Sequence, residues 1–301
     1  MFTASYAPPR AVLLFSLGSL LLPFATPFQR SVAFAPSSLS HRRPTAVFGW
    51  GPEPVWSSAE VLSVSPAPFH SECVCLTVAA PEAATEEETF QVPGQYVQVR
   101  AAGDEECKPS FFALANSPAA AQEGGCFEFL IKKNEGNAYC TSDVKEGDKI
   151  DVSQVLGNGF PIADHFDGLK YDFPTQNILL FAAGTGIAPI RSAIESGSLK
   201  LDTGRQARLY YGCRSPQEMA YAERFSIWEK EYGVQVVPVV SGDSAEWPGR
   251  TGYVQNALEE DGVAVARNTG VLLCGMKGMA EGVKDIVTKA GVFEGRVLTN
   301  F

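Results

Sequence analysis

The stretch Asn177–Glu195 reads NILLFAAGTGIAPIRSAIE. Its first half, Ile178–Ala182, is a continuous apolar run, which is typical of a parallel strand buried on both faces. The turn Gly184-Thr185-Gly186 follows, and two glycines so close let backbone N–H groups approach a ligand. Pro189 falls in the first turn of the next helix, where proline loses no useful donor. Strand, turn and helix start together predict an anion site, because unpaired N–H groups and the helix dipole face the turn.

A turn of this kind also occurs with a purely structural role. It departs from the dinucleotide fingerprint G-x-G-x-x-G, because Pro189 occupies the sixth position. The rest of the chain therefore has to decide between the two interpretations.

Composition favours an ordinary globular protein. The 301 residues suit two domains of roughly 100–200 residues each, and 45% are apolar and 19% charged. The net charge is −10, and four arginines but no acidic residues precede Glu53, so the remainder is more acidic still. An acidic body argues against nucleic acid and anionic membrane surfaces as partners.

The cysteines and histidines do not predict a metal site. Seven cysteines form no C-x-x-C pair, and only three histidines are present. These spacings match no zinc or iron–sulfur pattern. We expect reduced, mostly buried thiols and no metal.

The N-terminus is expected to be a leader rather than part of the fold. Residues 1–33 suit a secretory signal, since Arg10 precedes an apolar run that is too short and interrupted for a confident membrane span. Residues 34–52 begin Phe-Ala-Pro, contain no acid, and resemble a plastid transit segment. Together they resemble the bipartite leader of algae with secondary red plastids. A plastid location is expected, with secretion as the alternative; the cysteine spacing favours the plastid.

The pattern of expected strands and helices changes near residue 173. Residues 56–172 contain short strands separated by turn signals, which predict an antiparallel β-barrel: 61–65, 74–79, 96–100, 111–115, 127–132 and 149–152. Residues 173–301 alternate strands and helices, which predicts an α/β domain with a parallel sheet. Strands are expected at 178–182, 207–211, 234–240, 270–274 and 296–300, and helices from Pro189 and at 216–232, 255–260 and 279–290. No stable membrane span is expected in the mature chain.

Three strands of the α/β domain end in groups that suit a nucleotide. The first ends in Gly184–Gly186, and the second in Gly212 with Arg214 and Ser215 close behind. A later strand ends in Cys274-Gly275, with Met279 opening a helix. Ligands of parallel sheets bind beyond the carboxyl ends of the strands. These signals predict a nucleotide site, although each also has a structural explanation.

Taken together, the motifs resemble the ferredoxin–NADP reductase family of flavoproteins. The resemblance covers roughly Ser58 to Phe301 and is carried by four runs: Pro93–Tyr96, Gly184–Pro189, Tyr211–Arg214 and Cys274-Gly275. Lys108–Ala115 and Val297–Phe301 are similar to a plastid branch related to kiwifruit "fruit protein" reductase-like sequences. The resemblance implies a FAD-binding barrel at 56–172 and an NAD(P)-binding domain at 173–301.

The resemblance also implies a chemistry. A nicotinamide gives hydride to FAD, which then releases electrons one or two at a time. The nucleotide pyrophosphate would lie at Gly184–Gly186, Cys274 beside the nicotinamide and Phe301 against the flavin ring. Cys274 is alternatively a small buried strand residue, and Phe301 a plug in the core.

The flavin motif of the barrel departs from the family pattern. The family expects Arg-x-Tyr-Ser, and alignment on Leu114–Asn116 places Ser110, Phe112 and Ala113 at the three functional positions. Phe112 can stack on the ring, whereas Ala113 offers flavin N5 only a backbone N–H. Lys108 is the substitute for the missing positive charge.

A second flavin element in the family is a glycine followed by a hydroxyl residue at a helix start. Here the corresponding residues are Gly136, Asn137, Tyr139 and Thr141. Backbone N–H groups there can carry the flavin pyrophosphate. We expect FAD binding on this basis.

The choice between NADPH and NADH rests on few residues. Many relatives read the 2′-phosphate with a Ser-Arg pair, where this chain has Ser241-Gly242. Arg214 and Arg250 are possible substitutes, and Tyr253 is expected to stack on adenine. NADPH is slightly favoured because plastids supply it.

These inferences predict a plastid FAD-dependent NAD(P)H oxidoreductase. Its acceptor is left open among ferredoxin, a quinone, a haem and a small oxidant. The first alternative is a reductase-like binding or regulatory subunit with weakened flavin chemistry, as Ser110 and Ala113 suggest. The second is an electron-transfer subunit that feeds a partner enzyme.

Overall fold

The computed structural model describes residues 53–68, 70–81, 90–168, 171, 173–242 and 246–300. All elements belong to one compact unit, Phe48–Phe301. The leader expected at 1–33 and 34–52 lies outside the described residues, and so does Phe301. Within the described ranges, no helix is long and apolar enough to cross a membrane.

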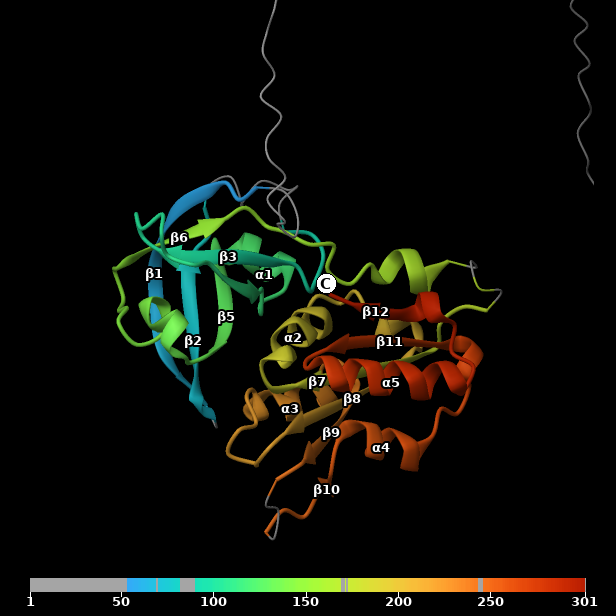
Figure 1. Ribbon diagram of the computed structural model, residues 1–301. Helices are drawn as coiled ribbons and strands as arrows, with labels where there is room; N and C mark the ends of the chain where they lie inside the picture. Colours follow the sequence, from blue (N-terminus) through green and yellow to red (C-terminus); the bar gives the residue numbers. More distant parts are fainter. Residues whose placement is uncertain are drawn as a thin grey trace, which may run out of the picture. The chain divides into compact units, whose positions relative to one another are not determined.

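The first lobe is the expected antiparallel barrel (Figure 1). Its six strands lie in the order β4-β3-β6-β1-β2-β5. Their bounds are β1 Trp56–Ala67, β2 His70–Ala79, β3 Tyr96–Ala101, β4 Ser110–Ala113, β5 Cys126–Lys132 and β6 Lys149–Ser153. The two end strands approach each other just beyond β4, where the Ala115 N–H donates to the Glu128 carbonyl at 2.8 Å. The curled sheet encloses apolar side chains that include Val61, Leu76, Val97, Phe127 and Val152.

The largest differences from the expected strand boundaries are in β1 and β2, and β4 ends at Ala113 rather than at residue 115. β1 and β2 are each longer than the apolar runs at 61–65 and 74–79. β1 is long because its first half pairs with β6 and its second half with β2. The short helix α1 (Pro118–Gly124) was not expected; the Ser117 side chain caps its start and Gly125 ends it in a left-handed conformation.

The second lobe is the expected parallel sheet, in the order β10-β9-β8-β7-β11-β12. Its strands are β7 Asn177–Ala183, β8 Gln206–Cys213, β9 Val234–Val240, β10 Arg250–Thr251, β11 Thr269–Cys274 and β12 Val297–Thr299. The chain leaves β7 for β8 on one side and later returns to β11 on the other, so the strand order reverses beside β7. This reversal places a crevice at the carboxyl ends of β7, β8 and β11.

Helices cover both faces of this sheet, which explains the uninterrupted apolar run of β7. The helices are α2 Ile187–Glu195, α3 Phe225–Lys230, α4 Val254–Asp261 and α5 Lys277–Lys289. Leu180 packs in one cluster with Ile190 of α2 and Trp228 of α3. Its neighbour Phe181 packs in another cluster with residues of α4 and α5. Successive side chains of a strand point to opposite faces, so both must be apolar here.

The helix expected over 216–232 is wrong in its extent. α3 covers only Phe225–Lys230, and a short 3₁₀ turn at Ala222–Arg224 precedes it. The preceding segment instead reaches the barrel, where Glu218 forms an antiparallel bridge with His70. Tyr221 has a positive φ of 60°, which is incompatible with a continuous helix.

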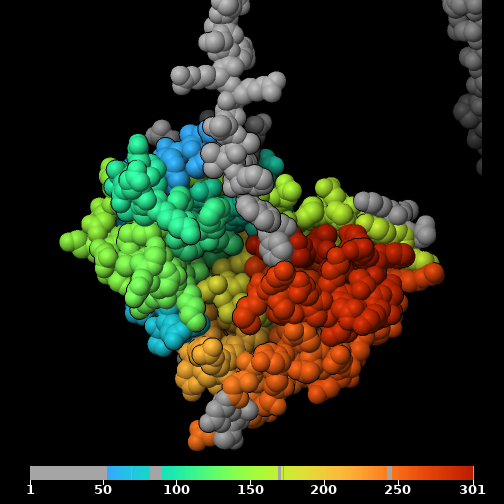
Figure 2. All heavy atoms as spheres, viewed as in Figure 1, coloured from blue at the N-terminus to red at the C-terminus, as the bar shows by residue number. Residues whose placement is uncertain are grey.

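Helix α2 joins the two lobes. The Ser192 hydroxyl donates to the Asn116 carbonyl at 2.8 Å, and Arg191 Nη1 lies 2.7 Å from Glu128 Oε2 of β5. Figure 2 shows the yellow α2 region between the green barrel and the red and orange second lobe. The sheet of the first lobe ends at Ser153, and the sheet of the second lobe begins at Asn177. The expected domain boundary near residues 172–173 falls between them and stays a prediction.

Candidate functional site

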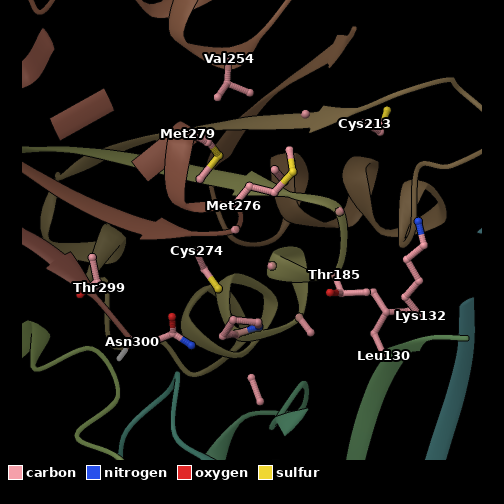
Figure 3. Close-up of a pocket in the computed structure, with 18 of the residues that line it drawn as sticks. Leu130, Lys132, Thr185, Cys213, Val254, Cys274, Met276, Met279, Thr299 and Asn300 are labelled. Atoms are coloured by element: carbon pink, nitrogen blue, oxygen red, sulfur yellow. The ribbon is translucent and has the colours of Figure 1, made fainter. Parts of the chain in front are cut away.

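A cavity of about 1650 Å³ lies between the lobes. Its walls come from the carboxyl ends of the parallel strands and from β3, β4 and β5 of the barrel (Figure 3). Pockets for a single small ligand usually measure about 300–1000 Å³. This cavity has room for more than one ring system.

The glycine turn forms the first part of the nucleotide wall. Gly184 has a φ of +53°, which glycine adopts without strain. A Cβ on Gly186 would lie 2.3 Å from the Cys274 carbonyl oxygen, so only glycine lets the turn approach β11 this closely. The turn leads directly into α2, which begins at Ile187 and not at Pro189. Gly184, Thr185, Gly186 and Pro189 all line the cavity, toward which the start of α2 directs the positive end of its dipole.

The end of β8 forms the second part of this wall. Gly212 lines the cavity and packs against Val254, whose Cγ1 would lie 3.1 Å from an added Cβ. Arg214 also lines the cavity, whereas Ser215 does not. A Cβ on Gly242 would lie 3.0 Å from Arg214 Cγ and 2.5 Å from its carbonyl oxygen. The stem of Arg214 therefore occupies the space next to position 242.

Arg250 and Tyr253 have different surroundings. The ring of Tyr253 is 61% exposed and lines the cavity. Arg250 is not part of the lining; its guanidinium pairs with Asp261 and lies 3.2 Å from Glu260. The structure thus brings Arg214, but not Arg250, to the nucleotide wall.

The end of β11 lies at another part of the cavity. Cys274, Met276, Met279 and Asn300 are labelled there in Figure 3, and Gly275 lines the cavity with them. Cys274 keeps part of its surface open, yet burial raises the pKa of its thiol to about 12, against the effect of a hydrogen bond with Asn300. The thiol is therefore protonated at neutral pH and does not act as a nucleophile.

Asn300 is a cavity residue that the sequence did not predict. Its Nδ2 donates to the Gly94 carbonyl at 3.4 Å. Its Oδ1 is buried and has no hydrogen-bond partner among the described residues. An unpaired buried acceptor is costly, and it suits a ligand that brings an amide or ring N–H.

The barrel contributes an aromatic wall. Phe112 and Ala113 line the cavity, as do Tyr96 and Phe111. The Tyr96 and Phe111 rings lie 5.9 Å apart, and Phe111 is 57% exposed. Phe112 also contacts Phe129 of the barrel core, with the ring centroids 6.0 Å apart. Sequence alignment predicted Phe112 as a ring contact but missed Phe111.

Ala113 lies at the free edge of β4. β4 is an end strand, and the Leu114 N–H after it donates to the Gln95 carbonyl on the β3 side. Because hydrogen bonds alternate along an antiparallel strand, the N–H of Ala113 turns to the other edge. It is available to a ligand in the cavity.

The loop after β6 completes the barrel wall. Gly157 has a φ of +80°, and a Cβ there would lie 2.7 Å from the Tyr96 ring. Gly159 has a φ of +60°, and a Cβ there would lie 2.6 Å from the Pro93 carbonyl oxygen. These glycines let the loop close over Pro93 and Tyr96.

The residues expected at the flavin pyrophosphate lie outside the cavity lining: Lys108, Ser110, Gly136, Asn137, Tyr139 and Thr141. The Tyr139 hydroxyl donates to the Val99 carbonyl at 2.7 Å. Burial raises the pKa of Tyr139 to about 12, and a hydrogen bond with Ser110 opposes this rise. The Thr141 hydroxyl donates to the Asn137 carbonyl at 2.9 Å. The hydroxyls of Tyr139 and Thr141 are therefore paired within the barrel.

A polar corner, formed by His70, Lys132, Arg214 and Glu218, also lines the cavity. His70 is 5% exposed, and its Nδ1 has no partner among the described residues. Burial lowers the pKa of His70, and Glu218 opposes this effect. Lys132 Nζ lies 2.9 Å from Glu72 Oε2. The sequence did not reveal this corner, because His70 and Glu218 belong to different lobes.

The fit to a flavin is uneven along the molecule. The half that would face the flavin ring has aromatic side chains and a free backbone N–H. The diphosphate half has no such lining. No group of metal-binding side chains occurs in the part of the chain that the structure describes.

Comparison with known proteins agrees with this architecture. Residues 180–285 match the family model of the oxidoreductase NAD-binding domain. A fruit protein of Actinidia deliciosa is 37% identical over 217 residues, which cover 69% of this chain and 66% of that protein. The gamma subunit of sulfhydrogenase 1 of Pyrococcus furiosus is 30% identical over 215 residues, covering 67% of this chain and 65% of the subunit. The chain thus spans just under two thirds of the length of these relatives.

Solved structures share the fold. An Amycolatopsis cytochrome P450 reductase superposes with a TM-score of 0.65 at 24% identity, covering 82% of this chain and 70% of that one. A ferredoxin NADP⁺ reductase of Neisseria gonorrhoeae, solved with bound FAD and NADP, gives a TM-score of 0.65 at 14% identity and covers 81% and 97%.

The barrel, the parallel sheet and the cavity between them define a two-lobed reductase with an oxidoreductase NAD-binding domain. The chain contains an oxidoreductase NAD-binding domain and has the two-lobed fold of ferredoxin reductase-like flavoproteins, which agrees with the resemblance found in its motifs.

Proposed function

We propose that this protein is a plastid oxidoreductase that passes hydride from NAD(P)H to FAD and then delivers electrons to a separate acceptor. The cavity between the lobes carries the proposal, because one wall suits a dinucleotide and the other an aromatic ring system. A bound flavin supplies the chemistry by taking two electrons as hydride and releasing them singly or in pairs. The protein side chains bind and orient the two rings.

The nucleotide wall explains how the nicotinamide is oriented. The N–H groups at Gly184–Gly186 and the α2 dipole attract the pyrophosphate. Gly275 lets the chain pass close to Ala183, since an added Cβ would lie 3.0 Å from Ala183 Cβ. We assign the nicotinamide to the space beside Cys274, where Asn300 Oδ1 can accept an amide N–H.

Flavin binding tests the proposal directly. The full chain, incubated with FAD, is expected to quench flavin fluorescence, and the bound flavin to lose its visible absorbance when NADPH or NADH is added anaerobically. A chain that binds no flavin contradicts the proposal. That result favours the second candidate, a reductase-like binding or regulatory subunit, which is also supported by Ser110 and Ala113 at the family's Arg and Ser positions.

We propose that Arg214 makes the protein favour NADPH over NADH. It lines the cavity, forms no ion pair among the described residues and lies next to Ser241, where the relatives carry their 2′-phosphate pair. Charge-assisted contacts to phosphate contribute about 1.5–3 kcal/mol. Arg214 is therefore sufficient to favour NADPH.

Two arginine variants test whether Arg214 or Arg250 is the residue that favours NADPH. Arg214→Ala is expected to lower kcat/KM for NADPH about tenfold or more and to leave that for NADH nearly unchanged. Arg250→Ala is the matched control, because Arg250 pairs with Asp261 and Glu260; it is expected to reduce stability without changing the ratio. A change of the ratio in the control alone contradicts the assignment.

The acceptor remains open among ferredoxin, a quinone, a haem and a small oxidant. Phe111 and Met276 are 57% and 67% exposed where they line the cavity, and so offer an apolar contact for a docking acceptor. Among the relatives, one is a bifunctional cytochrome P450/NADPH–P450 reductase of Fusarium oxysporum. The net charge of −10 disfavours an acidic ferredoxin. An acceptor screen with the flavin-loaded chain, scored by kcat/KM, distinguishes these classes.

The plastid location rests on the leader alone. Its acid-free composition and the Phe-Ala-Pro run at residues 34–36 support it. A fluorescent protein fused after residue 52 is expected to enter the plastid of an alga with a secondary red plastid. Accumulation in the medium supports the secreted alternative.

A further inference from the structure

The two positions that the family uses for the flavin pyrophosphate face each other in this protein. Ser110 lies opposite Val99 in the β3–β4 pair. Tyr139 reaches across from the turn Glu135–Cys140 and donates its hydroxyl to the Val99 carbonyl at 2.7 Å. The phenol ring therefore covers the strand where a phosphate would otherwise bind.

The neighbouring turn offers no anion site in place of this one. Asn137 uses its carboxamide locally, since Nδ2 donates to the Lys132 carbonyl and Oδ1 accepts the Asn134 N–H, both at 2.9 Å. The Thr141 hydroxyl donates to the Asn137 carbonyl at 2.9 Å. The 3₁₀ segment has a kink at Asn137 and spans only six residues. The N–H groups of Asn137 and Thr141 are used locally, since they donate to the carbonyls of Asn134 and Ala138.

Positive charge is also scarce at this end of the barrel. Arg100 is committed to Asp151, with Nε 3.2 Å from Oδ2, and its guanidinium stacks over Trp56 at 4.4 Å. Lys108 is exposed and lies outside the cavity lining. An exposed lysine on a flexible stem contributes little to the binding of one particular phosphate group.

The ring end of the cavity has the opposite character. Tyr96, Phe111 and Phe112 provide aromatic surface, and Ala113 provides a backbone N–H at a free strand edge. The groups that recognise a flavin are thus concentrated on the isoalloxazine ring.

We infer that this protein binds flavins by their ring, so that free FMN and riboflavin are exchangeable substrates that it reduces as readily as FAD. The inference rests on the proposed function, because it uses the same ring site and the same nicotinamide donor. It goes further in assigning the flavin a second role, as a substrate that leaves.

The reaction is balanced without any further reactant. The C4–H bond of the dihydronicotinamide breaks, and its hydride forms an N–H bond at flavin N5. The nucleotide is oxidised by two electrons, and the flavin is reduced by two and takes up one proton from water. The reduced flavin then dissociates, and an oxidised flavin takes its place.

The first test compares three flavins that share the isoalloxazine ring and differ in the phosphate or nucleotide group attached to it. Riboflavin, FMN and FAD are titrated into the full chain and their dissociation constants read from fluorescence quenching. We expect the three constants to lie within about tenfold of one another, because one screened surface charge changes affinity less than about fivefold. A constant for FAD more than tenfold below that for riboflavin overturns the inference and leaves the proposed function intact. Absence of any flavin binding overturns both.

The second test measures exchange. The chain is freed of flavin by gel filtration, and NADPH is added anaerobically with FMN in large molar excess over protein. Reduction of many equivalents of FMN, with hyperbolic dependence on FMN concentration, is expected. Reduction limited to a single equivalent means that reduced flavin stays bound and overturns the inference.

Variants test which residues determine the relative affinities for FAD, FMN and riboflavin. Ser110→Arg combined with Tyr139→Ser removes the covering ring and restores a cation; it is expected to tighten FAD, but not riboflavin, by about tenfold or more. Lys108→Gln is expected to weaken FMN less than about fivefold, with Lys133→Gln, another exposed lysine of the barrel, as its control. If Lys108→Gln alone weakens FMN by tenfold or more, the phosphate is held after all and the inference is wrong. Circular dichroism confirms that each variant is folded.

Discussion

At the scale of single residues, a few glycines determine how closely the backbone segments of the nucleotide wall pack at the cavity. Gly186 lies against the end of β11, where the Cys274 carbonyl leaves no space for a methyl group. Gly212 and Gly275 pack in the same way against Val254 and Ala183. Each contact lets backbone N–H groups face the cavity without a side chain in between. The absence of side-chain atoms at these glycines therefore determines the shape of the nucleotide wall.

Gly186→Ala is expected to cost about 1–3 kcal/mol of stability, because the new methyl group would overlap backbone atoms of β11. It is also expected to weaken NADPH binding by about tenfold or more, because the turn has to move away from its place. Chemical unfolding and NADPH titration measure the two effects. Gly278→Ala is the control, since nothing lies within 4 Å of its Cβ position, and this helical site is expected to gain up to about 1 kcal/mol. Equal behaviour of the two variants contradicts the argument.

At the scale of elements, α2 has two tasks. Its first turn carries the anion site, and its middle holds the second lobe against the barrel. Arg191 is 5% exposed and pairs with Glu128 of β5 at 2.7 Å and with Glu195 at 3.0 Å. Its guanidinium also lies 5.0 Å from the centroid of the Tyr221 ring. Arg224 and Trp228 bind the same Glu195 and complete the network.

Arg191→Met is expected to lower the free energy of unfolding by about 1.5–3 kcal/mol, because the half-buried Glu128 and Glu195 lose a charged hydrogen-bond partner. Glu128→Gln removes only the ion pair of Arg191 with the barrel and leaves Arg191 paired with Glu195. It is expected to cost less stability but to slow hydride transfer, with little change in the affinity for NADPH. Stopped-flow reduction of the bound flavin, compared with NADPH titration, separates the two effects. An unchanged rate in Glu128→Gln means that the contact is only structural.

At the scale of the whole molecule, two lobes share one cavity and bury several thiols in their cores. Burial raises the pKa of Cys73 from the ordinary 9.0 to about 11, and that of Cys140 and Cys213 to about 12. The folded protein thus keeps protons that the unfolded chain releases. These thiols were expected to be reduced and buried, and no described cysteine is in a disulfide.

Stability is therefore expected to fall as the pH rises above about 9. Below the ordinary thiol pKa both states keep the proton, so the thiols make no difference. Between pH 9 and about 12 the unfolded state has fewer protons, and the free energy of unfolding falls with pH by up to about 1.4 kcal/mol per unit for each buried thiol. Urea unfolding between pH 8 and about 10.5 measures the slope. The free energy of unfolding of Cys140→Ala is expected to fall less steeply with pH than that of Cys107→Ala, the control at a half-buried site. Equal slopes in the two variants contradict the argument.

The sequence by itself determined the architecture. The apolar run of β7, the glycine turn and the start of α2 are local features, because strand burial, positive φ and helix starts depend on neighbouring residues. The alternation of strands and helices was likewise sufficient to predict a parallel sheet behind an antiparallel barrel. Gly184, Gly212 and Cys274 lie in the cavity because any residue at the carboxyl end of a central parallel strand is brought there.

Only the tertiary structure decided which side chains reach the cavity. Arg214 and Arg250 were equivalent in the sequence, but Asp261, supplied by α4, draws Arg250 away. Tyr139 was expected at a phosphate and instead binds Val99, which lies forty residues earlier in the chain. His70 and Glu218 meet only because the lobes dock. The direction of a polar side chain follows the nearest partner in space, and that partner is fixed by contacts between distant segments rather than by local sequence.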